Sequence, residues 1–129
     1  MSDDPDVSPI SAEACPRASA SGRPAPDWLV VTLPSEIDIV NAEAVLGDLL
    51  AAIDCGSRIV VADMGMTAFC DVSGVYALLA AGRHALEAGV QLRVVARSEP
   101  VLRMFGLTGL DEAVPVYPTK EAAQPSPEN

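Results

Sequence analysis

The sequence has few of the residues that most catalytic and ligand-binding sites require. Its 129 residues include one histidine, His84, one lysine, Lys120, and three cysteines without C-x-x-C spacing. A single histidine leaves no Ser-His-Asp arrangement to assign, and an odd number of cysteines indicates neither a disulfide framework nor a zinc site. The chain also lacks a G-x-x-x-x-G-K motif for phosphate binding. We therefore expect no enzyme activity, no metal and no cofactor.

Aromatic residues and positive charges are also scarce. Only 4% of the residues are aromatic, whereas 50% are hydrophobic, which predicts a core of Val, Leu, Ile and Ala. The formal net charge is −10 with a pI near 4.2. Nucleic acid and anionic membrane surfaces are therefore not expected partners, because both bind basic surfaces.

The polar ends of the chain contrast with its apolar middle. Residues 1–26 are rich in Ser, Pro, Ala and Asp and begin with an acidic stretch rather than a signal-peptide pattern. We expect 1–26 and 124–129 to be disordered tails around one domain at 27–123. No apolar run reaches the length of a membrane span. A cytoplasmic protein with reduced cysteines is the resulting expectation.

Strand and helix patterns alternate through the domain. The expected strands are 28–33, 59–63, 91–96 and 114–117, with a loop or short strand at 35–40. The expected helices are 42–53, 72–87 and 101–105, followed by a final turn at 120–123. This alternation predicts an α/β fold with a small, mostly parallel or mixed sheet of four to five strands and helices packed on it.

Local residue types predict where the helices begin and end. We expect Asn41 and Ser98 to cap the first and third helices, and Thr119 the final turn. Gly56 and Gly106 are expected to end the first and third helices, and residues 107–111 to form a linker.

The stretch from Ile59 to Leu79 is the centre of this pattern. Ile59 to Ala62 reads as a buried strand closed by Asp63, and a short connection leads to Asp71 at the start of the second helix. The Asp71 carboxylate can accept hydrogen bonds from the free N–H groups of the first helical turn. Sites in open α/β sheets usually lie in loops that follow strands. We therefore place the candidate site at the start of this helix.

The second helix has two distinguishable faces. Residues repeating at helical spacing are expected to face the core: Val75, Leu78, Leu79, Gly82 and Leu86. A second stripe begins with Ser73, Tyr76 or Ala77. It is either a solvated face or a shallow partner-binding surface.

Two chemical alternatives involve the same stretch. Cys70 beside Asp71 has no identifiable base, so a structural cysteine is expected rather than a nucleophile. Val60 to Met64 resembles the strand that ends in the phospho-accepting aspartate of a response-regulator receiver. That chemistry also requires an acidic pair after the first strand, where this chain has Pro34-Ser35, and a lysine that meets the phosphoryl group. The only lysine follows the last strand, so we reject the receiver.

Four segments together resemble STAS domains, and more narrowly the bacterial anti-sigma factor antagonists. The matching segments are Glu36-Ile37-Asp38, Val60-Val61-Ala62-Asp63, Phe69-Cys70-Asp71-x-Ser73-Gly74-Val75 and Val101 to Leu110. The resemblance covers about Trp28 to Ala123, so that 27–123 would form the STAS domain. Each segment alone is weak, but four in order at sensible spacing are strong for the family.

The resemblance implies a mechanism. Such an antagonist binds an anti-sigma factor, usually a kinase with the histidine-kinase-like ATPase fold, and so frees a sigma factor. Phosphorylation of a serine directly after the signature aspartate ends the binding. The implied partner-binding residues in this chain are Asp38, Asp71, Val72, Ser73, Gly74 and Tyr76.

This chain departs from the family pattern at the phospho-acceptor. The position after Asp71 is Val72, which cannot be phosphorylated. The protein therefore binds constitutively, or is switched at Ser73 or elsewhere, or serves another partner. In the last case it would be an accessory subunit of a transporter or a sensory complex.

Overall fold

The structure is a computed structural model that describes residues 26–124. Apart from Pro26 and Gln124, the two predicted tails lie outside the described residues. The main sheet has four parallel strands in the order β1-β3-β5-β6. Its strands are β1 (Trp28–Thr32), β3 (Ile59–Met64), β5 (Gln91–Ala96) and β6 (Val116–Tyr117). The expected α/β fold with a small, mostly parallel sheet is confirmed.

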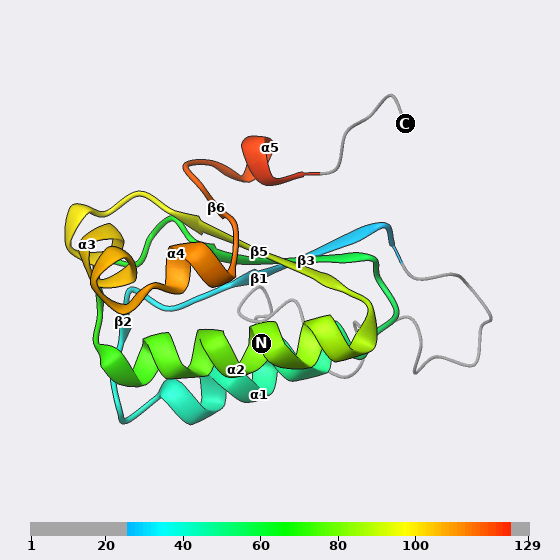
Figure 1. The fold of residues 1–129 in the computed structure, drawn as a ribbon, viewed down its shortest axis with the longest axis horizontal. Coiled ribbons are helices and arrows are strands. Elements are labelled where there is room, and N and C mark those ends of the chain that lie inside the picture. The colour runs from blue at the N-terminus through cyan, green and yellow to red at the C-terminus, as the bar shows by residue number, and fades with distance from the viewer. Residues whose placement is uncertain (1–25, 125–129) are drawn as a thin grey trace, which may run out of the picture.

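Helices cover the two faces of this sheet unequally. The two longest, α1 (Ala42–Ile53) and α2 (Val72–Ala88), lie side by side on one face (Figure 1). α3 (Glu99–Thr108) and α4 (Leu110–Ala113) also contribute to the core between this face and the helices. The other face carries α5 (Lys120–Ala123). Among residues 26–124, no helix has both the length and the hydropathy needed to cross a lipid bilayer.

A second, two-stranded sheet positions the candidate site. β2 (Glu36–Ile37) pairs in parallel with β4 (Phe69–Cys70), and Ile37 lies opposite Cys70. The segment 35–40 is therefore a short strand followed by a turn, and the connection after β3 contains a strand that the sequence did not predict. Because the two strands are parallel, the residues that follow them, Asp38 and Asp71, emerge at the same edge.

The third helix is longer than predicted. α3 runs through Gly106 and ends at Gly109, whose φ of 81° is left-handed. Glycine adopts this conformation without the strain that a Cβ would cause, which explains why the helix ends here. The predicted linker 107–111 is therefore wrong: it contains the last turn of α3 and the start of α4.

The buried face of α2 consists largely of small residues rather than leucines. Val75 and Leu78 face the core as expected, but Leu79 is only partly buried and Leu86 is 80% exposed. The buried residues of α2 are Gly74, Val75, Ala77, Leu78, Ala81 and Ala85. Small side chains allow α2 to lie close against α1 and the sheet. Of the residues predicted to face the core, only Leu86 is exposed, so the prediction is wrong at that position.

The predicted caps differ in outcome. Asp71 and Thr119 accept hydrogen bonds from the first turns of α2 and α5, as predicted. Asn41 and Ser98 stand at the N-cap positions, but neither side chain makes a capping hydrogen bond. Each bonds elsewhere instead: the Asn41 amide donates to the Glu36 carbonyl, and the Ser98 hydroxyl to the carbonyl of Ala68.

The cysteines do not share one state. Cys70 is a buried free thiol. Cys55 is disulfide-bonded, so the expectation that all three cysteines are reduced is wrong at this position.

Candidate functional site

Asp71 connects β4 to α2 and determines how the helix begins. Its backbone is extended, and its Oδ1 accepts hydrogen bonds from the backbone N–H groups of Ser73 (2.8 Å) and Gly74 (3.3 Å). Two of the donors left free at the helix N-terminus are thereby satisfied, and the negative charge lies at the positive end of the helix dipole. The backbone N–H of Asp71 donates to the carbonyl of Ile37, 3.0 Å away, which joins this cap to β2.

Gly74 brings the first turn of α2 against the small sheet. A Cβ at this position would lie 2.5 Å from the Cys70 Sγ and 2.8 Å from the Ile37 Cγ2. Both distances are shorter than van der Waals contact allows, so only glycine permits this approach. The predicted site residue Gly74 is buried, and its role is to position the residues around it.

Asp38 shapes the turn between β2 and α1. Its Oδ1 accepts a hydrogen bond from the backbone N–H of Val40 (3.0 Å), and its own backbone N–H donates to the Asn41 Oδ1 (3.0 Å). The turn projects Ile39 and Val40, both strongly exposed, into solvent. This turn and the start of α2 lie at the same end of the small sheet.

Exposed apolar side chains gather at this end of the molecule. Val72 is 44% exposed, Tyr76 64% and Phe69 47%. With Ile39 and Val40 they form what we call the docking surface, defined as Ile39, Val40, Phe69, Val72 and Tyr76. Ser73 lies half-buried beside it. Ala77 is buried, so the sequence-based grouping of Ser73, Tyr76 and Ala77 on one surface is wrong at Ala77.

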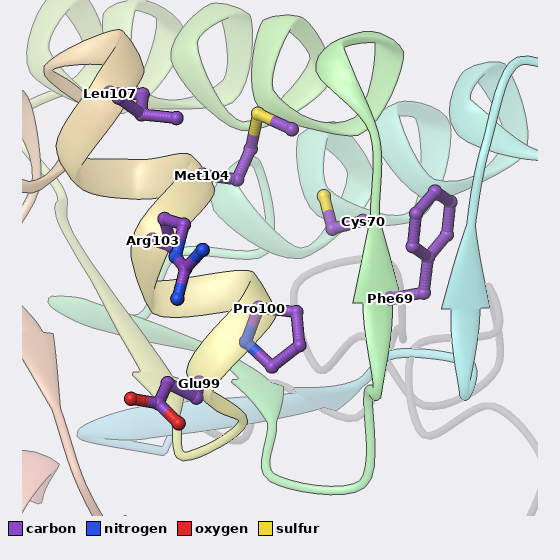
Figure 2. A pocket seen from close by; sticks show the side chains of 7 residues that line it. All are labelled: Phe69, Cys70, Glu99, Pro100, Arg103, Met104 and Leu107. Carbon is purple, nitrogen blue, oxygen red and sulfur yellow. The ribbon is translucent and has the colours of Figure 1, made fainter.

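A pocket of about 290 Å³ adjoins this surface between β4 and α3 (Figure 2). Two of its lining residues come from β4 and the rest from α3: Phe69, Cys70, Glu99, Pro100, Arg103, Met104 and Leu107. The sequence did not predict this pocket, because its two walls are about one βα unit apart in the chain. Leu107 was assigned to a linker, and no local pattern pairs it with Phe69.

The Cys70 thiol at this pocket is not suited to nucleophilic chemistry. Burial and, secondarily, the Asp71 carboxylate raise its pKa to about 11. The thiol is therefore neutral at physiological pH, whereas the thiolate is the nucleophilic form. The sequence-based interpretation of Cys70 as a structural residue agrees with this environment.

The structure also brings Lys120 to Asp63, which the sequence did not predict. The Nζ of Lys120 lies 4.0 Å from the Oδ2 of Asp63, while the Oδ1 accepts from the Gly65 N–H at 2.9 Å. This pair resembles part of a receiver site, but Leu33, Pro34 and Ser35 still follow β1 in place of acidic residues. Within 26–124, no three His, Cys, Asp or Glu side chains gather in a way that would hold a metal ion.

Known proteins share this fold. A family model described as the STAS domain matches residues 19–123. The crystal structure of an anti-sigma factor antagonist from Mycobacterium paratuberculosis is 31% identical to this chain, with a TM-score of 0.67; the match covers 74% of this chain and 81% of that one. The anti-sigma factor antagonist SpoIIAA in its unphosphorylated form is 22% identical, with a TM-score of 0.63 and coverage of 76% and 87%. At that identity, SpoIIAA shows the fold alone.

No curated protein matches the chain significantly. The family model nevertheless spans most of the sequence and all the residues of the candidate site, and the Mycobacterium structure matches 74% of this chain. The chain therefore belongs to the STAS domain family, and the 31% identical Mycobacterium structure is described as an anti-sigma factor antagonist.

Proposed function

We propose that this protein is an anti-sigma factor antagonist, which binds an anti-sigma factor and so frees a sigma factor for transcription. The observation that carries this proposal is the docking surface at the start of α2. The description of the Mycobacterium structure supports it. As the sequence resemblance implies, the partner would be an anti-sigma factor with the histidine-kinase-like ATPase fold.

The docking surface has the properties of a protein-binding site. Val72, Tyr76 and Phe69 present apolar side chains that gain about 25 cal/mol for each Å² of apolar area removed from water. Tyrosine is also among the residues enriched at energetically dominant interface positions. The Asp71 cap and the Gly74 contact hold these side chains on a rigid element, so little conformational freedom is lost on binding.

Control of binding must differ from the family pattern. Val72 is the first residue of α2 and has no hydroxyl to phosphorylate. Ser73 is the only hydroxyl-bearing residue in the first turn, so we propose that the protein binds constitutively or is switched at Ser73. A phosphate there would bring about two negative charges next to the Asp71 carboxylate, which already accepts from the Ser73 N–H. Repulsion between these groups would disturb the cap as well as the docking surface.

A charge placed in the docking surface tests the function. The matched variants are Val72→Asp, inside the surface, and Leu86→Asp, on an exposed residue near the other end of the same helix. Wild-type protein is used to capture partners from a native lysate, and a captured anti-sigma factor is then purified and titrated calorimetrically with each variant. We expect Val72→Asp to weaken binding at least about tenfold, or 1.4 kcal/mol, and Leu86→Asp to bind like wild type.

The outcomes separate the two functions. Equal affinity of both variants would remove Val72 from the interface. Capture of transporter or sensory-complex components, without an anti-sigma factor, would favour the accessory-subunit alternative. That role needs no phospho-acceptor, so a valine at position 72 is compatible with it. Phosphopeptide mapping that finds Ser73 unmodified under every growth condition would exclude the switch at Ser73 and leave constitutive binding or a switch elsewhere.

A further inference from the structure

One side of α3 is left open beside β4. Val101 and Phe105 are fully buried and fix the helix against the core. Residues at helical spacing on the adjoining side of α3 form one wall of the pocket: Glu99, Pro100, Arg103, Met104 and Leu107. The wall is therefore a single stripe of side chains on a firmly anchored helix.

The inner part of the pocket is apolar. The side chains of Cys70 and Met104 point into the space between β4 and α3 (Figure 2). Burial raises the pKa of the Cys70 thiol to about 11, so the thiol is neutral at physiological pH. Methionine adapts its shape to the group that it contacts. An apolar side chain can therefore enter this space without displacing water from a charged group.

The volume of the pocket favours a protein side chain over a cofactor. The pocket measures about 290 Å³, just below the range of about 300–1,000 Å³ that is usual for small-molecule sites. In protein interfaces, a few side chains that fill such pockets contribute most of the binding energy. Leu107 in the wall is 77% exposed, and an inserted side chain would remove part of its apolar area from water.

The pocket is continuous with the docking surface. Phe69 contributes to both, and its ring lies on the opposite side of β4 from the Cys70 side chain (Figure 2). β4 has only two residues, so a partner that covers the docking surface reaches the mouth of the pocket across this short strand.

A basic side chain lies at this pocket, although the formal net charge of the protein is −10. Arg103 is exposed, and within residues 26–124 its guanidinium has no carboxylate at ion-pair distance. Glu99, one turn earlier on α3, therefore does not neutralise it. A guanidinium presents a planar set of donors that matches a carboxylate, so the complementary group on a partner is an Asp or a Glu.

We propose that this pocket is a second contact with the anti-sigma factor, which inserts an apolar side chain between β4 and α3 and pairs a neighbouring carboxylate with Arg103. The inference rests on the proposed function and adds a determinant of specificity to it. The docking surface supplies apolar area, whereas the pocket requires one side chain of suitable size next to one negative charge. An anti-sigma factor that lacks either feature would bind less tightly.

Two matched pairs of variants test this contact by calorimetric titration of the purified anti-sigma factor. Leu107→Ala removes part of the pocket wall, and Leu102→Ala removes the same side chain from an exposed position of α3 outside the pocket. Arg103→Glu reverses the charge at the pocket, and Arg97→Glu makes the same change at an exposed arginine outside it. We expect Leu107→Ala and Arg103→Glu each to weaken binding about tenfold, and both controls to bind like wild type.

A charge exchange between the two proteins identifies the ion pair directly. Each exposed Asp or Glu of the anti-sigma factor is replaced in turn by arginine. One of these replacements should restore the affinity of Arg103→Glu and leave that of Arg97→Glu unimproved. If no replacement restores it, the pairing with Arg103 is wrong. The side chains changed here are exposed, so all four variants should melt close to the wild type.

Val72→Asp separates failure of this contact from failure of the proposed function. If Val72→Asp weakens binding while Leu107→Ala and Arg103→Glu bind like wild type, the docking surface is supported and the pocket contact is overturned. If no anti-sigma factor is captured, both proposals are overturned. A dimer in light scattering that Leu107→Ala dissociates would assign the pocket to a second copy of the chain, which also overturns the contact.

Discussion

Replacement of Gly74 by alanine tests the packing that positions the docking surface. The added methyl group would lie 2.5 Å from the Cys70 Sγ and 2.8 Å from the Ile37 Cγ2. Cys70 and Ile37 are both buried, and each contact atom is bonded directly to its Cβ, so packing around these short side chains leaves them little room to rotate away. Relief of the clash therefore requires α2 to move away from β2 and β4.

The expected cost follows from two opposing effects. Overpacking a close-packed site costs about 1–3 kcal/mol, whereas replacing glycine by alanine in a helix gains up to about 1 kcal/mol. At Gly74 the clash should exceed the gain, leaving a net loss of up to about 2 kcal/mol. Gly47 in α1 is the matched control, because its Cβ would have no atom within 4 Å. Gly47→Ala should therefore be stabilising.

Urea and thermal unfolding of both variants measure this difference. For a domain of this size a loss of 1 kcal/mol lowers the melting temperature by about 4 °C or more. Gly74→Ala should thus melt below the wild type and Gly47→Ala above it. If Gly74→Ala were as stable as Gly47→Ala, the close contact between α2 and the small sheet would be refuted. Gly74→Ala should also weaken anti-sigma factor binding, since the docking surface moves with α2.

Three further changes probe the cap, the core and the buried thiol. Asp71→Ala removes the acceptor for two backbone N–H groups and should cost about 1 kcal/mol of unfolding free energy, with Asp71→Ser retaining most of it; equal denaturant midpoints would show that the cap contributes nothing. Leu78→Ala should cost about 2–5 kcal/mol and Leu86→Ala very little, because only Leu78 is fully buried; similar losses would contradict the assignment of the α2 face. Burial raises the pKa of Cys70 from its ordinary value of 9.0 to about 11, so the unfolded thiol ionises first and stability is lost as the pH rises from 9 to 11. Cys70→Ala should lose less stability than wild type in that window, and parallel pH profiles would contradict the shift.

Local patterns in the sequence predict most of the main fold. The bounds of α1 and β5 coincide with the predicted ranges 42–53 and 91–96, because each has a clear apolar period and a distinct boundary residue. The Asp71 cap was predictable for the same reason: the acceptor and the N–H groups it satisfies are adjacent in sequence.

Features that depend on distant residues were not predictable. β2 and β4 have two residues each, too few for a period, and their pairing joins segments more than thirty positions apart. The alanine-lined face of α2 depends on how closely α1 approaches, which no property of α2 alone reveals. The sequence therefore predicted the loop before α2 with its Asp71 cap, but not the pocket beside it. From the sequence, Gly74 could be predicted only as a motif residue. Its close contact with Ile37 in the structure explains why glycine is needed there.

The docking surface consists of side chains that the core does not need. Val72, Phe69 and Tyr76 are 44%, 47% and 64% exposed, whereas Gly74 and the buried atoms beneath them determine the backbone path. Substitutions at such exposed positions usually change stability by less than about 0.5 kcal/mol. Duplicated genes for proteins of this kind can therefore diverge in partner choice by changing a few surface residues, while the scaffold is inherited intact. Cross-talk between parallel signalling pathways in one cell would then be avoided by mismatched surfaces rather than by different folds.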